Sequence, residues 1–164
     1  MFTRMKAVGV AVLAAAGLAG VIPATSAEAS VGCYGDYCSG QDPQATGCAA
    51  DAQTVAFEDL SGARIEVRWS PTCKTNWARW QQYPVGFKSD LALSLVAIQD
   101  TGYSQSASGI DDVNGTRAGT YWTPMIYSPV HKVKAAANLM CGDATLIGAA
   151  FDCATNGKIE TRAV

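Results

Sequence analysis

Cysteine is the residue type in this sequence whose number and spacing bear most directly on chemistry. Six cysteines occur along the chain: Cys33, Cys38, Cys48, Cys73, Cys141 and Cys153. An even number of cysteines in an exported chain predicts disulfides, here three of them. A zinc site typically includes two cysteines separated by two residues, a spacing that no pair here has. We therefore expect disulfides, no metal site and no cofactor.

Two predicted strands narrow the disulfide pairing. Residues 54–58 (TVAFE) and 63–69 favour strands, with residues 59–62 as the turn between them. A hairpin centred between Leu60 and Ser61 places Cys48 opposite Cys73. The remaining bridges are then Cys33–Cys38 and Cys141–Cys153. The alternative, Cys33–Cys48 with Cys38–Cys73, stays open at this point.

Groups suited to acid, base or nucleophilic catalysis are sparse. His131 is the only histidine, and it follows Ser128-Pro129 in a predicted loop. A Ser-His-Asp arrangement would have to use it, but no G-x-S-x-G segment supplies the serine. Glu58 and Glu66 are a candidate carboxylate pair on one sheet face, as glycoside hydrolysis requires. The signal is weak, so we nominate no catalytic residue and favour a non-catalytic protein.

A stretch rich in tryptophan and arginine is the best candidate for a binding surface. Residues 64–80 (RIEVRWSPTCKTNWARW) contain three of the four tryptophans. Indole rings beside guanidinium groups offer stacking and cation–π contacts to a ligand. The predicted binding residues are Arg68, Trp69, Trp77, Arg79 and Trp80. The alternative is that the tryptophans are the core anchors of a small domain.

Local patterns predict how this stretch is positioned. Apolar and charged residues alternate over 64–69, which is typical of a strand with one apolar face. Ion pairs on the charged face are expected to be solvated and to stabilise little. Ser70-Pro71 then predicts a helical turn over 72–78, because serine caps helices and proline is favoured at their first position. On that turn Trp77 and Trp80 would share one face, beneath the arginines.

The rest of the chain favours loops and short strands. Residues 31–53 predict an ordered, stapled loop in which Asp42 and Asp51 cap turns. Residues 91–96 alternate like a strand, and Pro124 predicts an edge strand or a bend.

The C-terminal part completes a mainly β prediction. Residues 133–141 and 145–153 favour a last hairpin, with a helix over 133–140 as the alternative. The tail from Asn156 is expected to fray. The predicted fold is a small disulfide-stapled barrel or sandwich of about five to seven short strands with one or two short helical turns.

The first 29 residues predict export. Arg4 and Lys6 precede an uncharged apolar run over 7–22, and small polar residues follow. This is the pattern of a secretory signal peptide, and the apolar run is short for a transmembrane helix. Cleavage after Ala29 leaves residues 30–164 as a single domain. We expect a secreted, extracellular protein without a membrane anchor.

The charge balance argues against nucleic acid as a partner. The chain has 12 basic and 14 acidic residues, and the formal net charge is −2. The basic residues form no stripe that would follow a phosphate backbone. The candidate partners are instead a cell-wall polymer or another extracellular protein.

The order of several segments resembles a known family. The segments are CSGQDPQATGC (38–48), DAQTV (51–55), the 64–80 block, YWTPMI (121–126) and the final cysteine pair. Together they resemble the YjfA-like family of secreted bacterial proteins, a domain of unknown function that also occurs at the ends of some helix-turn-helix regulators. SPTCKTNWAR (70–79) is the most specific part, and the resemblance covers roughly Cys33 to Cys153.

What the resemblance implies is a domain identity and an exported bacterial setting. The chain differs from regulator-attached relatives in having an export signal and no helix-turn-helix. No activity and no catalytic residues follow from the resemblance.

Three classes of function remain. The first is a secreted binding module that uses the residues around Arg68–Trp80 or an edge formed by Tyr121 and Trp122. The second is a structural or protective envelope protein without a defined ligand. The third is a small extracellular hydrolase with acidic catalytic residues, which requires a cleft with two facing carboxylates.

Overall fold

The computed structural model describes residues 31–60, 62–84, 90–108, 110, 113–114, 118–141 and 158–164. The predicted signal peptide, the predicted strand over 145–153 and the predicted Cys141–Cys153 bridge lie outside the described residues. Within the described ranges, no helix is long and apolar enough to cross a membrane.

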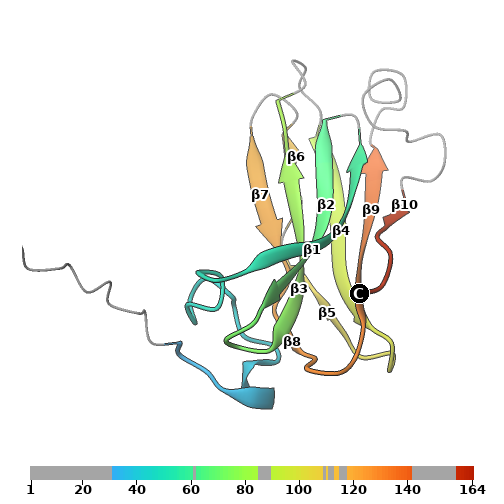
Figure 1. Cartoon of the computed structure of the whole chain (residues 1–164). Coiled ribbons are helices and arrows are strands. Elements are labelled where there is room, and N and C mark those ends of the chain that lie inside the picture. Colours follow the sequence, from blue (N-terminus) through green and yellow to red (C-terminus); the bar gives the residue numbers. More distant parts are fainter. Residues whose placement is uncertain are drawn as a thin grey trace, which may run out of the picture.

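Two antiparallel sheets make up the fold, so the mainly β prediction is confirmed (Figure 1). The first sheet contains β1 (Gln53–Leu60), β2 (Ala63–Ser70), β3 (Thr75–Gln82), β7 (Gly119–Trp122) and β8 (Ile126–Tyr127). The second contains β4 (Asp90–Gln99), β5 (Ser104–Ser106), β6 (Val113–Asn114), β9 (Val133–Cys141) and β10 (Lys158–Glu160). One 3-10 turn, η1 (Gly35–Cys38), precedes them.

The core lies between the facing sheets. Ile65, Val67 and Trp80 of the first sheet are buried in one cluster with Leu95 and Val133 of the second. These side chains alternate with outward-facing neighbours, as the pleat of a strand requires. The alternation predicted for β2 and β4 is therefore confirmed, and the two sheets pack as a sandwich.

The segment after β2 corrects one prediction. Residues 71–74 form a tight turn rather than the start of a helix, with Lys74 at a φ of 57° and its N–H donating to the Ser70 carbonyl at 2.9 Å. The chain then returns as β3, because residues 75–82 find hydrogen-bonding partners on both sides, in β2 and in β7 and β8. Tertiary pairing outweighs the local helix signal from Ser70-Pro71.

The β1–β2 hairpin has a different register from the predicted one. Leu60 pairs with Ala63, so the centre of the hairpin lies one residue further along the chain than predicted and each pairing near the turn is shifted by two residues. A bulge between Thr54 and Ala56 shifts the register by one residue beyond that point.

The N-terminal loop is ordered and stapled, as predicted. Disulfides join Cys33 to Cys38 and Cys48 to Cys73, so the preferred pairing is confirmed for the described cysteines. Asp51 accepts hydrogen bonds from the Ser70 hydroxyl and the Thr72 amide, which fixes the β2–β3 turn. Asp42 likewise accepts from the amides of residues 44 and 45, so both aspartates cap turns.

The remaining elements settle the open alternatives. Residues 133–141 form a strand, and Pro124 stands at a bend between β7 and β8. The expected fraying of the tail is wrong, because β10 pairs with β9. The tail continues along that edge, where the amide of Val164 donates to the carbonyl of Val133 at 3.1 Å.

Candidate binding surface

The five predicted binding residues lie on two different faces of the first sheet. Because Trp77 and Trp80 are three positions apart in a strand, they point in opposite directions. Trp69 and Trp80 lie on the inner face, and Arg68, Trp77 and Arg79 lie on the outer face. The structure therefore does not bring the five residues together into one platform.

On the outer face, the two arginines surround a buried carboxylate. Glu66 is only 2 % exposed, and it accepts hydrogen bonds from Arg79 Nε at 2.8 Å and Thr54 Oγ1 at 3.1 Å. Arg68 lies 3.9 Å from the same carboxylate and donates to Thr54 and to the carbonyl of Ala52. The ion pairs of Glu66 are thus partly buried rather than solvated, which corrects the sequence-based expectation for these pairs, whereas the Arg64–Asp59 pair on the same face is solvated as expected. The guanidinium groups of Arg68 and Arg79 both have partners within the protein.

The predicted cation–π contacts with tryptophan are replaced by another pair. Among the described residues, the guanidinium of Arg64 lies 4.3 Å from the centre of the Phe57 ring. Arg64 also forms a two-point ion pair with Asp59. This contact lies at the solvent-exposed end of the hairpin, away from the tryptophans.

Two of the predicted tryptophans are core residues. Trp80 is fully buried between the sheets, and Trp77 packs against Cys38, Cys48 and Cys73. Neither ring is accessible to a ligand in this structure. The core-anchor interpretation therefore describes these two residues, whereas Trp69 is partly exposed.

Trp69 lines an open hollow of ≈ 320 Å³, which we call the Trp69 hollow. Val55, Pro129 and Val130 add apolar surface, and His131 and Lys132 add polar groups. The hollow is completed by Asn76, Ser128 and Val164. It lies where the chain crosses from β8 in the first sheet to β9 in the second. Pockets that bind ligands typically combine apolar walls with a few polar groups in this way.

Asp100 holds one wall of the Trp69 hollow. Its carboxylate lies 3.0 Å from His131 Nδ1 and accepts the amide of Lys132 at 3.1 Å. The amide of Asp100 in turn donates to the carbonyl of Lys132 at 2.9 Å. These contacts fix the 129–132 segment against the end of β4.

The Asp100–His131 pair is not part of a Ser-His-Asp triad in this arrangement. The only serine that lines the hollow is Ser128, and its hydroxyl donates to Asn76 Oδ1 at 2.6 Å. No hydrogen bond joins Ser128 to His131 among the described contacts. His131 is about half exposed, as predicted for a loop residue.

The predicted carboxylate pair is on opposite faces of the hairpin. Glu58 pairs with Ile65, whereas Glu66 pairs with Phe57, so their side chains point to opposite sides of the first sheet. Neither the Trp69 hollow nor the two hollows described below are lined by two carboxylates among their described residues. The two-carboxylate geometry of a glycosidase is therefore not present in these hollows.

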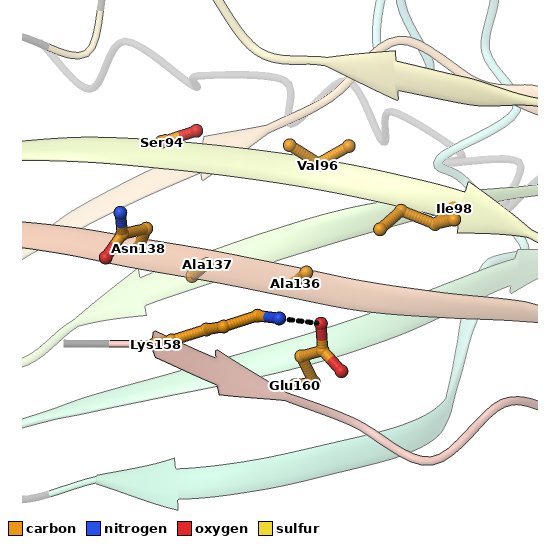
Figure 2. Close-up of a pocket in the computed structure, with 8 residues that line it drawn as sticks. All are labelled: Ser94, Val96, Ile98, Ala136, Ala137, Asn138, Lys158 and Glu160. Carbon is orange, nitrogen blue, oxygen red and sulfur yellow. Dashed lines mark ion pairs between the residues drawn. The ribbon is translucent and has the colours of Figure 1, made fainter. Parts of the chain in front are cut away.

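The outward face of the second sheet carries a shallow groove of ≈ 350 Å³. Figure 2 shows Val96 and Ile98 of β4 on one side, Ala136 of β9 between the strands, and Lys158 and Glu160 of β10 on the other. Hydrogen bonds from Lys134 and Lys158 lower the pKa of Glu160, so this carboxylate is paired with two ammonium groups. The described lining residues of the groove include no aromatic ring, and its two charged groups, Lys158 and Glu160, are paired with each other.

Tyr121 and Trp122 line a smaller hollow of ≈ 200 Å³ at the edge of the sandwich. The indole N–H of Trp122 donates to the carboxylate of Asp42 at 2.9 Å. Burial would raise the pKa of Asp42, but this bond and those from the amides of residues 44 and 45 lower it overall. Trp122 therefore ties the stapled loop to the first sheet.

Sequence reasoning missed two exposed tyrosines. Tyr34 is 86 % and Tyr37 is 87 % exposed, and both lie within the short loop closed by Cys33–Cys38. Their exposure could have been predicted from the segment CYGDYC, because side chains in so small a disulfide loop have no room to fold inward. Aromatic side chains held so far into solvent are candidates for contact with a partner.

Comparison with known protein families places most of the two described sheets within a family. The profile of a family described as "Protein of unknown function (DUF2690)" matches residues 36–137. No curated protein matches the chain significantly, and neither does any solved structure. The matched segment runs from η1 into β9 and includes the first sheet, most of the second and most of the Trp69 hollow. The chain belongs to this family of proteins of unknown function.

Proposed function

We propose that this protein is an exported, non-catalytic binding module and that its ligand contacts the Trp69 hollow. The observation that carries the proposal is a partly exposed indole within an open hollow that also has apolar walls and a polar rim. Among the predicted binding residues, Trp69 alone combines ring surface with an adjoining hollow. The other members of the predicted set serve the core and the Glu66 network.

Export is supported by two features. The first 29 residues have the composition of a secretory signal peptide. Two disulfides in the described part of the chain suit an oxidising compartment. The similarity of the SPTCKTNWAR segment to the YjfA-like secreted proteins is a further reason to place the chain outside the cell.

The chemistry of the hollow favours a sugar-containing cell-wall polymer as the ligand. An indole face packs on the apolar face of a sugar ring, while polar groups bond its hydroxyls. Here His131 and Lys132 lie on the rim beside Trp69, and Lys132 offers a positive charge to acidic substituents. No nucleic-acid contact is proposed, because the chain is acidic overall.

The test is equilibrium binding of the protein to insoluble cell-wall polysaccharide. Trp69→Ala should weaken binding about 30-fold, the effect of losing a side chain worth about 2 kcal/mol at the centre of an interface. The matched control is Phe57→Ala, which removes a half-exposed ring from the opposite face of the same sheet. Equal binding by the two variants would contradict the proposal.

A second candidate is recognition of another extracellular protein through Tyr34 and Tyr37. The observation that favours it is their exposure on a loop that a disulfide restrains, because a rigid aromatic contact loses little entropy on binding. Cross-linking at the exposed tyrosines, with and without Tyr34→Ala and Tyr37→Ala, distinguishes this surface from the Trp69 hollow. A structural role without a ligand is the remaining alternative, and it predicts no effect from either set of variants.

A further inference from the structure

The two disulfides of the N-terminal region place four sulfur atoms in one cluster. The Sγ atoms of Cys33, Cys38, Cys48 and Cys73 all lie within 4.8 Å of one another. Cys33 Sγ and Cys48 Sγ belong to different bridges, yet they are 3.6 Å apart. Four thiolates around a zinc ion have Zn–S distances of about 2.3 Å, which places neighbouring sulfurs about 3.8 Å apart in a tetrahedron. The spacing between the bridges therefore already suits such a site.

The surroundings of the cluster resemble those of a structural metal site. Cys38 and Cys48 are fully buried, and Trp77 and Met125 pack in the same cluster, so the sulfurs have an apolar shell that limits access of water. Cys33 is partly exposed and provides a path by which a reductant and an ion can enter.

The backbone geometry is compatible with both states. The Cα atoms are 5.2 Å apart in Cys33–Cys38 and 5.8 Å apart in Cys48–Cys73. From Cα atoms this close, rotation about the Cα–Cβ bonds is enough to separate two bonded sulfurs to the spacing of zinc ligands. The four residues also come from two segments that hydrogen bonds hold together, since Asp51 bonds both Ser70 and Thr72 beside Cys73.

We propose that the reduced protein binds one Zn²⁺ through Cys33, Cys38, Cys48 and Cys73. Each disulfide takes two electrons and two protons from a dithiol, which is itself oxidised to a disulfide. The four resulting thiols release four protons as their thiolates bind the ion. The same sulfurs thus form two bridges under oxidising conditions and a four-thiolate metal site under reducing conditions. The expectation of no metal site rested on sequence spacing, which does not show that the fold gathers these residues.

The experiment uses the full chain with Cys141→Ser and Cys153→Ser, so that only the clustered cysteines can react. The protein is reduced with excess dithiol, freed of the reductant without air, and titrated with Zn²⁺ and, separately, with Co²⁺. The expected result is one ion per reduced chain, with the absorption of tetrahedral thiolate cobalt, and no binding by the oxidised protein.

Two controls make the result specific. In the same background, Cys33→Ser should weaken zinc binding at least about tenfold. Loss of a residue that only supports a ligand already lowers metal affinity by about that factor, and this variant removes a ligand itself. Phe57→Ser, a change at a half-exposed side chain of β1 outside the cluster, should leave zinc affinity unchanged. A reduced chain with four free thiols that binds no zinc overturns the proposal whether or not it keeps its fold, because thiolate binding of zinc can itself drive folding. Equal affinity in the Cys33→Ser variant overturns it as well.

Discussion

At the scale of single residues, buried and capped carboxylates carry much of the architecture. Glu66 is enclosed by Arg79, Arg68 and Thr54 on the outer face of the first sheet. A buried carboxylate is costly unless it is paired and hydrogen-bonded, so each of these partners offsets part of its desolvation. Asp51 has a different role, because it fixes the turn that carries Cys73.

Glu66→Ala should destabilise the protein by about 3 kcal/mol, because it leaves Arg79 without its partner in a partly buried site. Urea denaturation of the oxidised protein measures the change in the free energy of unfolding. Asp59→Ala is the control, because it removes an exposed carboxylate whose pair with Arg64 is in contact with solvent. The loss for Asp59→Ala should be much smaller, and equal losses would contradict the role assigned to Glu66.

Asp51→Asn should change how stability depends on pH. Burial acts to raise the pKa of Asp51, but hydrogen bonds from Ser70 and Thr72 outweigh it and lower the pKa below its usual value. A carboxylate with a lowered folded-state pKa stabilises the protein above its unfolded pKa of about 3.9 and loses that contribution as pH falls through the folded-state pKa. Wild type should therefore exceed Asp51→Asn in stability at neutral pH, with a gap that closes in acid. Thermal denaturation from about pH 2 to about pH 7, an interval that covers the titration of carboxylates, measures this difference in stability. A difference that stays constant over the interval would contradict the role assigned to Asp51.

At the scale of elements, the 129–132 segment positions the Trp69 hollow, and the two disulfides position the loop that carries Tyr34 and Tyr37. The 129–132 segment links the sheets and depends on Asp100 for its position. The stapled loop depends on its bridges and on the contact of Asp42 with Trp122.

Asp100→Ala should loosen the 129–132 segment without unfolding the sandwich, because Asp100 is half exposed and, in the described part of the chain, its side chain forms hydrogen bonds with this segment. Hydrogen exchange at the amide of Lys132 should become faster, and binding to cell-wall polysaccharide should weaken. Asp100→Asn keeps an oxygen acceptor and should preserve most of the protection. Unchanged exchange in the alanine variant would show that other contacts hold the segment.

The two bridges should differ in their effect on stability. Cys48–Cys73 spans 25 residues and Cys33–Cys38 spans 5. Loop-closure entropy predicts losses of about 3.5 and about 2 kcal/mol when each pair is replaced by alanine. Chemical denaturation of the two double variants, with the other cysteines oxidised, measures the difference, and the reverse order would contradict the entropic explanation.

Sequence patterns predicted well the features that depend on neighbouring residues, and poorly those that depend on pairing between distant segments. The strand alternation of β2 and the Cys48–Cys73 bridge follow from short-range spacing, so they were accessible without a structure. The strand β3 was not, because its conformation also depends on distant partners in β7 and β8, which range from Gly119 (paired with Gln82) to Tyr127 (paired with Thr75). For the same reason the tryptophans were assigned to one face when they lie on two.

At the scale of the whole molecule, chain crossings between the sheets create the candidate site. The Trp69 hollow gathers Val55 and Trp69 from the first sheet with residues 129–132 and Val164 from the far end of the chain. No local pattern reports that such distant residues meet. Composition could indicate an exported, acidic, disulfide-stapled β protein, but the position of the hollow requires the fold.

The measurement that tests the central claim most directly is quenching of tryptophan fluorescence in wild type and Trp69→Phe, with and without insoluble cell-wall polysaccharide. Trp77 and Trp80 are buried, and the partly exposed Trp122 is present in both proteins, so the difference between them isolates the emission of Trp69. We predict that a neutral quencher reaches this emission in the free protein and that the polysaccharide protects it. Quenching of Trp69 that the polysaccharide leaves unchanged, or equal protection in wild type and Trp69→Phe, would contradict a ligand in the Trp69 hollow.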